Sequence, residues 1–259
     1  MIEVHNLTFG YSSTEDGQIL KGVDFAAKTG KLTALIGTNG AGKSTLLKTI
    51  MGILKGKGEI SVNGKPVSQY STKDFSSTVS YLSQDNDCKV NLSVFEVVML
   101  GRMGSMSFRV SDEDIAATQE VLERLNLQCF GSRSIMELSG GQRQLVFMAQ
   151  ALVKEPKILI LDEPTSALDL HKQFDLLTLL KNLTQENDFT TLVTLHHLDL
   201  AAMFADEIIV LKEGTVYAQG APQDIFTEAM MEDVYRVKTK IYIDDNGLPH
   251  VIPLEAIIN

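Results

Sequence analysis

The chain has 259 residues, 44% of them hydrophobic and 22% charged, and its formal net charge is -10. This composition is typical of a globular protein with a sizeable core, organised as one large domain or two small ones. The acidic balance disfavours general binding to a nucleic-acid backbone and leaves only a local basic patch as a route to one.

The first 84 residues predict mostly strands around one helix. Strands are indicated by the segments IEVHNLTF, ILKGVDFAA, LTALIG, GEISVNG and TVSYLS, which are alternating or short apolar runs bounded by turn residues. A helix is predicted through KSTLLKTIMG, with Gly52 ending it. Residues 84–92 are polar and predict a loop.

From about residue 93 to residue 154 the pattern becomes helical. Ser93 with Glu96 forms a capping box before an apolar run, and Ser111 precedes an acidic first turn. A third helix is predicted over GQRQLVFMAQALVKE and stops at Pro156.

From residue 157 onwards, strand and helix patterns alternate. KILIL, TTLVTL, EIIVL and TVYAQG predict strands, and helices are predicted at 170–186 and 197–205. Such alternation predicts an α/β fold whose mostly parallel sheet is covered on both faces. A helical insertion splits this fold, and the last 25 residues or so predict a short helix and a β tail.

Three further features restrict the location and the redox state. The N-terminal segment MIEVHNLTFGY lacks a basic start and an apolar run, so no signal peptide is expected. Apolar runs such as ILIL and VVML fall far short of the roughly 18 residues of a membrane helix, so any membrane role is expected to come through a partner. Cys88 and Cys129 are the only cysteines and predict two reduced thiols rather than a disulfide or zinc site.

The segment GTNGAGKST, residues 37–45, lies between a predicted strand and a predicted helix and fits the phosphate-binding pattern G-x-x-x-x-G-K-[ST]. Its glycines allow backbone N–H groups to approach phosphates, and the helix N-terminus adds a positive dipole. Lys43 is expected to reach the β- and γ-phosphates, and Ser44 to bind Mg²⁺. The alternative, a glycine-rich turn with a chance lysine, explains neither the motif nor its context.

Two carboxylates follow the apolar strand in ILILDE, residues 158–163. Ligands of doubly wound sheets bind at the carboxyl ends of strands. Asp162 is therefore expected to hold Mg²⁺, and Glu163 to polarise an attacking water. Alone this pattern is a common acidic loop, and the phosphate-binding segment gives it weight.

Single polar and aromatic residues are weaker candidates. Gln84 ends a predicted strand and could contact Mg²⁺ or water, although a surface glutamine is the simpler reading. His196 follows a strand and is placed to contact a γ-phosphate, whereas adjacent His196 and His197 are poorly arranged to share a metal. Tyr11 could stack on adenine or simply pack at a strand end. The methionines of VVMLGRMGSMSF fit either core filling or an adaptable docking surface.

LSGGQRQ, residues 138–144, is a second candidate anion cradle. Spacing alone leaves open whether it holds a phosphate of its own chain or one of another chain. Together with the motifs above, it makes the chain resemble the ATP-binding subunit of an ABC transporter over nearly its whole length. The matching elements are Tyr11 as the adenine-stacking aromatic, Gly37 to Thr45 as Walker A (with Asn39, Gly40, Ala41, Gly42, Lys43 and Ser44), Gln84 as the Q-loop, Ser139, Gly140, Gly141 and Gln142 as the signature, Asp162 and Glu163 as Walker B, Asp169 ending the D-loop SALD, and His196 as the switch histidine.

A narrower resemblance is to importers of the iron-siderophore, haem and vitamin B12 type. It is carried by VVMLGR, ELSGGQRQ, VTLHHLDLAA and the tail segment GLPHVIPLE. His197 departs from this pattern, since the family usually has aspartate there, and this puts the surroundings of the switch histidine in doubt.

The resemblance implies a P-loop NTPase core with a mostly parallel sheet, an N-terminal antiparallel β region and an inserted helical subdomain. It divides the chain into a nucleotide-binding core (1–84 and 157–234), a helical subdomain with the signature (85–156) and a C-terminal β tail (235–259). It also implies a head-to-tail homodimer in which the signature of one chain covers the γ-phosphate of ATP·Mg²⁺ held by the other.

The implied partners are two membrane permeases, contacted near Gln84 and the helical insertion, and indirectly a substrate-binding protein. The expected location is the cytoplasmic face of the cell membrane. The main alternative is a soluble ABC ATPase of iron-sulfur cluster assembly, although its signature region is usually richer in charge. A DNA-repair ATPase would need long coiled coils between Lys43 and Ser139, and a P-loop kinase would not explain LSGGQ.

Overall fold

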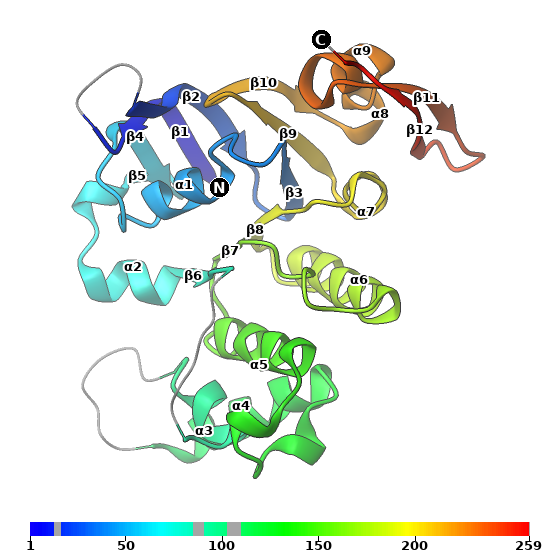
Figure 1. Ribbon diagram of the computed structural model, residues 1–259. Helices are drawn as coiled ribbons and strands as arrows, with labels where there is room; N and C mark the ends of the chain where they lie inside the picture. Colours follow the sequence, from blue (N-terminus) through cyan, green and yellow to red (C-terminus); the bar gives the residue numbers. More distant parts are fainter. Residues whose placement is uncertain (13–16, 85–90, 103–109, 259) are drawn as a thin grey trace. The chain divides into compact units, whose positions relative to one another are not determined.

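The computed structural model describes residues 1–12, 17–84, 91–102 and 110–258 (Figure 1). The chain divides into two compact units, one made of Met1–Gln69 with Leu177–Asn259 and the other of Tyr70–Leu176. The finer subdivision predicted from the sequence, with a helical segment at 85–156, stays a prediction. Cys88, Met103 and Met106 lie outside the described residues.

The first unit contains an antiparallel sheet near the N-terminus. Its strand order is β2-β1-β4-β5. The strands are β1 (Ile2–Gly10), β2 (Gln18–Ala27), β4 (Lys57–Val62) and β5 (Lys65–Pro66). The alternation in IEVHNLTF is interrupted at Asn6, whose positive φ of 47° accompanies a register shift between β1 and both of its neighbours. The N-terminal antiparallel β region therefore matches the prediction.

The second sheet region of the first unit is mostly parallel. β3 (Lys31–Ile36) pairs in parallel with β8 (Thr190–Thr194) and β9 (Glu207–Lys212), and β10 (Thr215–Gly220) pairs antiparallel with β9. Leu32, Ala34, Leu35 and Ile36 of β3 have no exposed surface. A strand buried on both faces needs a mostly apolar run, as this one has, with Thr33 as its one buried polar residue.

Helices and a terminal hairpin complete the first unit. α1 (Lys43–Ile50) ends before Gly52, whose φ of 70° supplies the left-handed residue that a helix stop needs. α7 is Leu198–Phe204, α8 is Pro222–Ile225, α9 is Glu228–Met230, and a short 3₁₀ turn η2 is Val67–Gln69. The π-helical turn η5 (Met231–Tyr235) leads into the hairpin of β11 (Val237–Ile243) and β12 (Pro249–Ala256) (Figure 1).

The second unit is largely helical. Its helices are α2 (Thr72–Thr78), α3 (Val94–Met99), α4 (Asp112–Arg124) and α5 (Gly140–Leu152), with 3₁₀ turns η3 (Gln128–Phe130) and η4 (Ile135–Glu137). The parallel strands β6 (Val79–Leu82) and β7 (Ile158–Leu161) belong to it, and the boundary between the units falls within α6 (Leu170–Glu186). The capping box predicted at Ser93 is present. The acidic helix start predicted at Ser111 is present too, and there Ser111 and Asp114 form a second capping box that was not predicted.

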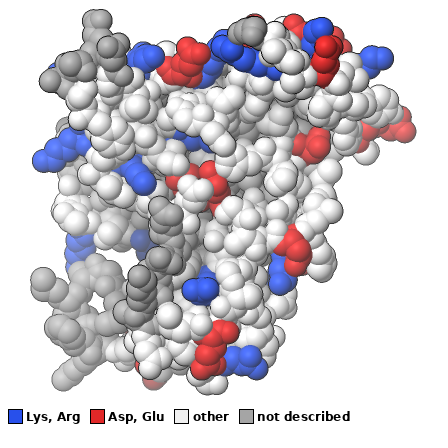
Figure 2. All heavy atoms as spheres, in the orientation of Figure 1, with Lys and Arg blue, Asp and Glu red and all other residues white. Residues whose placement is uncertain are grey.

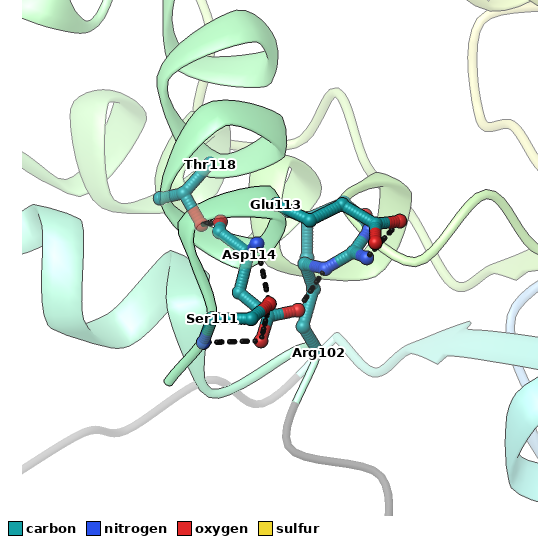
Figure 3. Close-up of polar contacts among 6 residues, drawn as sticks. Arg102, Ser111, Glu113, Asp114 and Thr118 are labelled. Atoms are coloured by element: carbon teal, nitrogen blue, oxygen red, sulfur yellow. Dashed lines mark hydrogen bonds and ion pairs between the residues drawn. The ribbon is translucent and has the colours of Figure 1, made fainter. Parts of the chain in front are cut away.

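Arg102, in the turn after α3, pairs with the first turn of α4 (Figure 3) and also contacts the C-terminal end of α5. Arg102 Nε donates to Asp114 Oδ1 at 2.6 Å, and its Nη1 donates to the carbonyl of Val153 at 3.1 Å. The Asp114 carboxylate also accepts the N–H and the hydroxyl of Ser111, the cap of α4. These bonds from Arg102 and Ser111 lower the pKa of Asp114 to about 2.

None of the helices in the described part of the chain has both the length and the apolar character needed to cross a bilayer.

Candidate functional site

The phosphate-binding segment leaves β3 through a turn that only glycine can make. Gly37 has a φ of 148°, and a Cβ there would lie 2.2 Å from the carbonyl oxygen of Leu211. Gly42, the N-cap of α1, has a φ of 104°, which L residues with side chains rarely adopt. Gly40 also has a positive φ, and a Cβ there would meet nothing within 4 Å. The backbone is therefore shaped for close approach of a ligand at its tip.

Lys43 begins α1 and is 6% exposed. Its Nζ donates to the carbonyls of Gly37 at 2.8 Å and Thr38 at 3.0 Å, so the ammonium is held inside the curve of its own loop. In the described residues no side chain caps the N-terminus of α1. A buried cation beside a helix N-terminus favours an anion such as phosphate. Ser44 is half-buried in the first turn of the same helix.

Tyr235 supports the same turn and was not identified from the sequence. It ends η5, and its oxygen accepts a hydrogen bond from the N–H of Gly37. Burial raises the pKa of the Tyr235 hydroxyl, so the phenol stays neutral at physiological pH. No local signal marks this residue, because the contact joins positions nearly two hundred residues apart.

Tyr11 is 71% exposed, and its ring meets Phe9 edge-on with the centroids 5.0 Å apart. One face of such a ring remains available for stacking on an aromatic base. His196 and His197 are also exposed and follow β8, with His197 as the N-cap of α7. His197 makes no side-chain cap bond, and the described residues hold no group of three His, Cys, Asp or Glu side chains arranged for a metal.

The second unit brings together two residues that the sequence placed at strand ends. β6 and β7 pair in parallel with Leu82 opposite Leu161, so their carboxyl ends lie next to each other. Gln84 Nε2 donates to Glu163 Oε2 at 2.7 Å. The predicted water-polarising carboxylate and the predicted Q-loop amide are therefore in direct contact.

Asp162 is 1% exposed, and its N–H donates to the carbonyl of Leu82 at 2.8 Å. A buried carboxylate needs hydrogen-bond donors or a cation as partners. Within the second unit, Asp162 and Gln84 offer oxygen ligands, which Mg²⁺ prefers, and Mg²⁺ in nucleotide sites needs only one or two protein ligands besides phosphate and water. The residues present thus fit this ion.

The signature forms a capped helix start rather than an open cradle. Ser139 is the N-cap of α5; its Oγ accepts the N–H of Gln142 at 3.3 Å, and its own N–H donates to Gln142 Oε1 at 2.9 Å. A hydroxyl that accepts one bond keeps its proton for another acceptor. Ser139 and Gly140 are both exposed. A Cβ on Gly141 would lie 2.9 Å from the carbonyl oxygen of Ala167, so the helix start is pressed against the D-loop.

Asp169, at the end of the D-loop, acts locally as a helix cap. Its Oδ1 accepts the N–H of Lys172 at 3.0 Å, and its carboxylate pairs with the Lys172 ammonium at 3.8 Å. The first unit thus carries Tyr11, the phosphate-binding loop and His196. The second carries Gln84, Asp162, Glu163, the signature and Asp169.

Comparisons with known proteins identify the family of this chain. A family model described as "ABC transporter" matches residues 20–166. The chain is 37% identical over 246 residues to the iron(3+)-hydroxamate import ATP-binding protein FhuC of Bacillus subtilis, covering 94% of this chain and 90% of the relative. It is 35% identical over 253 residues to the ferric enterobactin transport ATP-binding protein FepC of Escherichia coli, covering 96% and 92%.

Two solved structures are similar over most of the chain. One is an inward-facing conformation of a metal-chelate type ABC transporter, with a TM-score of 0.82, 28% identity and coverage of 98% of this chain and 97% of that one. The other is the dimeric ATP-binding cassette MJ0796 bound to ADP and phosphate, with a TM-score of 0.77, 28% identity and coverage of 85% and 98%. Both confirm the predicted α/β fold with a P-loop NTPase core.

Proposed function

Because the chain belongs to the ABC transporter family of ATP-binding subunits, which hydrolyse ATP, we propose that it powers import of a metal chelate of the iron-siderophore, haem or cobalamin type. The Gln84–Glu163 hydrogen bond carries the hydrolytic part of the proposal, because it joins the amide and the carboxylate that would handle the attacking water. The import and transport roles of the related FhuC and FepC support the import part.

ATP binding is assigned to the first unit. The loop from Gly37 to Thr45, including Asn39 and Ala41, would surround the phosphates, and Tyr11 would stack on adenine. Lys43 would exchange its loop carbonyls for β- and γ-phosphate oxygens, which are stronger acceptors because they are charged. The positive φ of Gly40 and the open space beside it support this assignment, because they leave room for a ligand at the tip of the loop.

Hydrolysis is assigned to the residues that would activate and orient the attacking water. Glu163 would accept a proton from water as it attacks the γ-phosphate, and Gln84 would orient the carboxylate and the water. His196, exposed after β8, would donate to the γ-phosphate. Ser44, Asp162 and Gln84 would hold Mg²⁺, which neutralises charge on the phosphates when bound with the nucleotide.

The signature is proposed to act on the nucleotide of a second copy. Ser139, Gly140, Gly141 and Gln142 would cover the γ-phosphate held by the other chain in a head-to-tail homodimer, with Asp169 at the same interface. The exposed Ser139 hydroxyl accepts one bond from the Gln142 N–H and keeps its proton, which supports a donor role towards phosphate. The related cassette MJ0796 is a dimer, which supports pairing of this chain too.

Two membrane permeases and, through them, a substrate-binding protein are the proposed partners, with the subunit bound at the cytoplasmic face of the membrane. The related cbiO1 of Clostridium perfringens is part of a transporter complex, which supports such an assembly. On the face in Figure 2, acidic and basic side chains are interspersed, which fits a protein partner better than a nucleic acid. The relatives favour import over iron-sulfur cluster assembly.

Co-purification followed by reconstitution tests the proposal. The tagged chain should retain an integral-membrane permease in mild detergent, and ATP turnover of the reconstituted complex should rise with one ferric-siderophore, haem or cobalamin loaded on its binding protein. Glu163→Gln serves as the matched control, because it should retain the permease without chelate-stimulated turnover. Recovery of a soluble iron-sulfur scaffold and no permease would overturn the proposal.

A further inference from the structure

Glu163 occupies a backbone conformation that needs support. Its φ is 51°, in the left-handed region, where a non-glycine residue is held only when surrounding groups fix it. The direction of its side chain depends on that conformation. Groups that hold the Glu163 backbone therefore also set where its carboxylate lies.

Three donors meet at the carbonyl oxygen of Glu163. The N–H of Ser166 donates at 3.3 Å and the Ser166 hydroxyl at 3.1 Å, both from the same turn. The third donor is Gln144 Nε2 at 3.4 Å, which belongs to α5. Gln144 is thus a link between the turn of the proposed catalytic base and a separate helix.

Gln144 is suited to transmit the position of that helix. Gln144 is 7% exposed, so its side-chain amide cannot exchange the Glu163 carbonyl for bulk water. Gln144 also shares a helix face with Gly140 and Gly141, which precede it by four and three residues. At Gly141 the helix backbone contacts Ala167 so closely that a Cβ would be 2.9 Å from its carbonyl oxygen. The first turns of α5 are thereby seated on the segment that follows Glu163.

We propose that Gln144 is a positioning residue that fixes the backbone of Glu163 and couples its carboxylate to the signature helix. The inference rests on the proposed function, in which Ser139 and Gly140 contact the ATP of the partner. Seating of α5 on the partner's nucleotide would then align the base for the chain's own nucleotide. Each site of the dimer would sense whether the other is closed.

A double-mutant cycle tests this link. Gln144→Met keeps the length of the side chain and removes the donor, and Gln150→Met changes a half-buried glutamine of the same helix as a matched control. The turnover number and KM for ATP are measured for both variants, for Glu163→Gln, and for the double variant Gln144→Met/Glu163→Gln under single-turnover conditions.

Gln144→Met is expected to lower kcat about tenfold or more, with KM nearly unchanged, because misplacement of a catalytic group costs rate rather than binding. In the Glu163→Gln background it should cause no further loss, since the residue acts through Glu163. The Gln150→Met control should match the wild type. If Gln144→Met fails to fold, Gln144→Asn keeps an amide too short to reach the carbonyl and is judged by the same criteria.

Three outcomes would overturn the inference. Equal kcat for Gln144→Met and Gln150→Met, with Glu163→Gln strongly impaired, would remove the coupling and leave the proposed function intact. Losses that simply multiply in the double variant would show that Gln144 acts independently of Glu163. If Glu163→Gln itself turned over ATP normally, the inference and the assigned base would both be wrong.

Discussion

The N-termini of α1 and α5 both follow small residues, and both are candidates to meet a phosphate, yet they are built differently. α1 starts at Gly42 with no side-chain cap, and its buried Lys43 is bonded to its own loop. α5 starts at Ser139 with a complete capping box. A helix end that leaves its backbone donors to a ligand suits a resident nucleotide. A self-capped end is stable without one, which suits a surface that meets its ligand only when a second chain arrives.

Glu163→Gln should have the largest effect on turnover. It also tests whether the N-termini of α1 and α5 meet the same nucleotide in a dimer. Loss of the proposed base should lower ATP hydrolysis by about 10²–10⁴-fold while ATP binding persists, so an ATP-bound dimer should accumulate. Size-exclusion chromatography with ATP and steady-state turnover measure the two effects. Normal turnover would contradict the role of Glu163 as the base. A variant that stays monomeric with ATP would contradict the proposal that the two helix ends meet one nucleotide in a dimer.

Ser139→Arg tests whether α5 serves its own chain or another. The arginine would block the exposed helix start and should lower turnover by roughly 10²–10³-fold, the loss typical of a missing charge-stabilising donor. ATP binding to the isolated monomer should remain close to the wild type. A collapse of monomer affinity, measured by calorimetry, would mean that both helix ends serve one intramolecular site.

Tyr235→Phe should weaken the phosphate-binding turn that precedes α1. Loss of the hydroxyl that accepts the Gly37 N–H should destabilise the phosphate-binding turn by about 0.5–1.5 kcal/mol and raise the Kd for ATP by up to about tenfold. Tyr242→Phe, on a residue that is 56% exposed in the terminal hairpin, is the control and should bind ATP normally. Equal Kd values for ATP in Tyr235→Phe and Tyr242→Phe would show that the Tyr235 hydroxyl does not support the phosphate-binding turn.

Asp114→Asn should have the smallest effect, and that effect is on stability. It removes the partner of Arg102, which links α4 to the end of α5. The folded pKa of Asp114 is lowered from 3.8 to about 2, so its contribution to stability is present above pH 3.8 and is lost as the pH falls through 2. The variant should be less stable than the wild type near neutral pH, and the difference should vanish towards pH 2. Urea unfolding at several pH values measures this.

Asp112→Asn provides the comparison for that series. It removes a charge from the same helix turn but none of the contacts of Arg102 with Glu113, Asp114 and Val153, so it should not reproduce the pH-dependent difference. If the two variants behaved alike, general charge rather than the Arg102 pair would explain the effect.

Much of this molecule was predictable because its determinants are local. A serine three residues before a glutamate predicted the start of α3, and Gly52 predicted the end of α1. The positions of Gln84 and Glu163 after two strands were also predicted, whereas their direct contact is visible only in the structure. In each case neighbouring residues, or the regular geometry of a sheet, determine the result.

Other features depend on packing between distant segments, which a single sequence does not encode in any short pattern. The amide of Gln144 looks like one more polar residue on an amphipathic helix, and only the fold reveals Glu163 beside it. Tyr235 ends a π-helical turn, and Arg236 follows with a φ of 56°, neither of which has a sequence signal. Hence the phosphate-binding and signature segments were identified, while the residues that support them were not.

The left-handed backbone of Glu163 has an evolutionary consequence. Glycine or asparagine would relax this position at lower conformational cost, so selection for stability alone would favour replacing the glutamate. A carboxylate kept there marks a trade-off between durability and activity. Searches for more heat-resistant variants of this chain should therefore repeatedly find inactive proteins changed at residue 163.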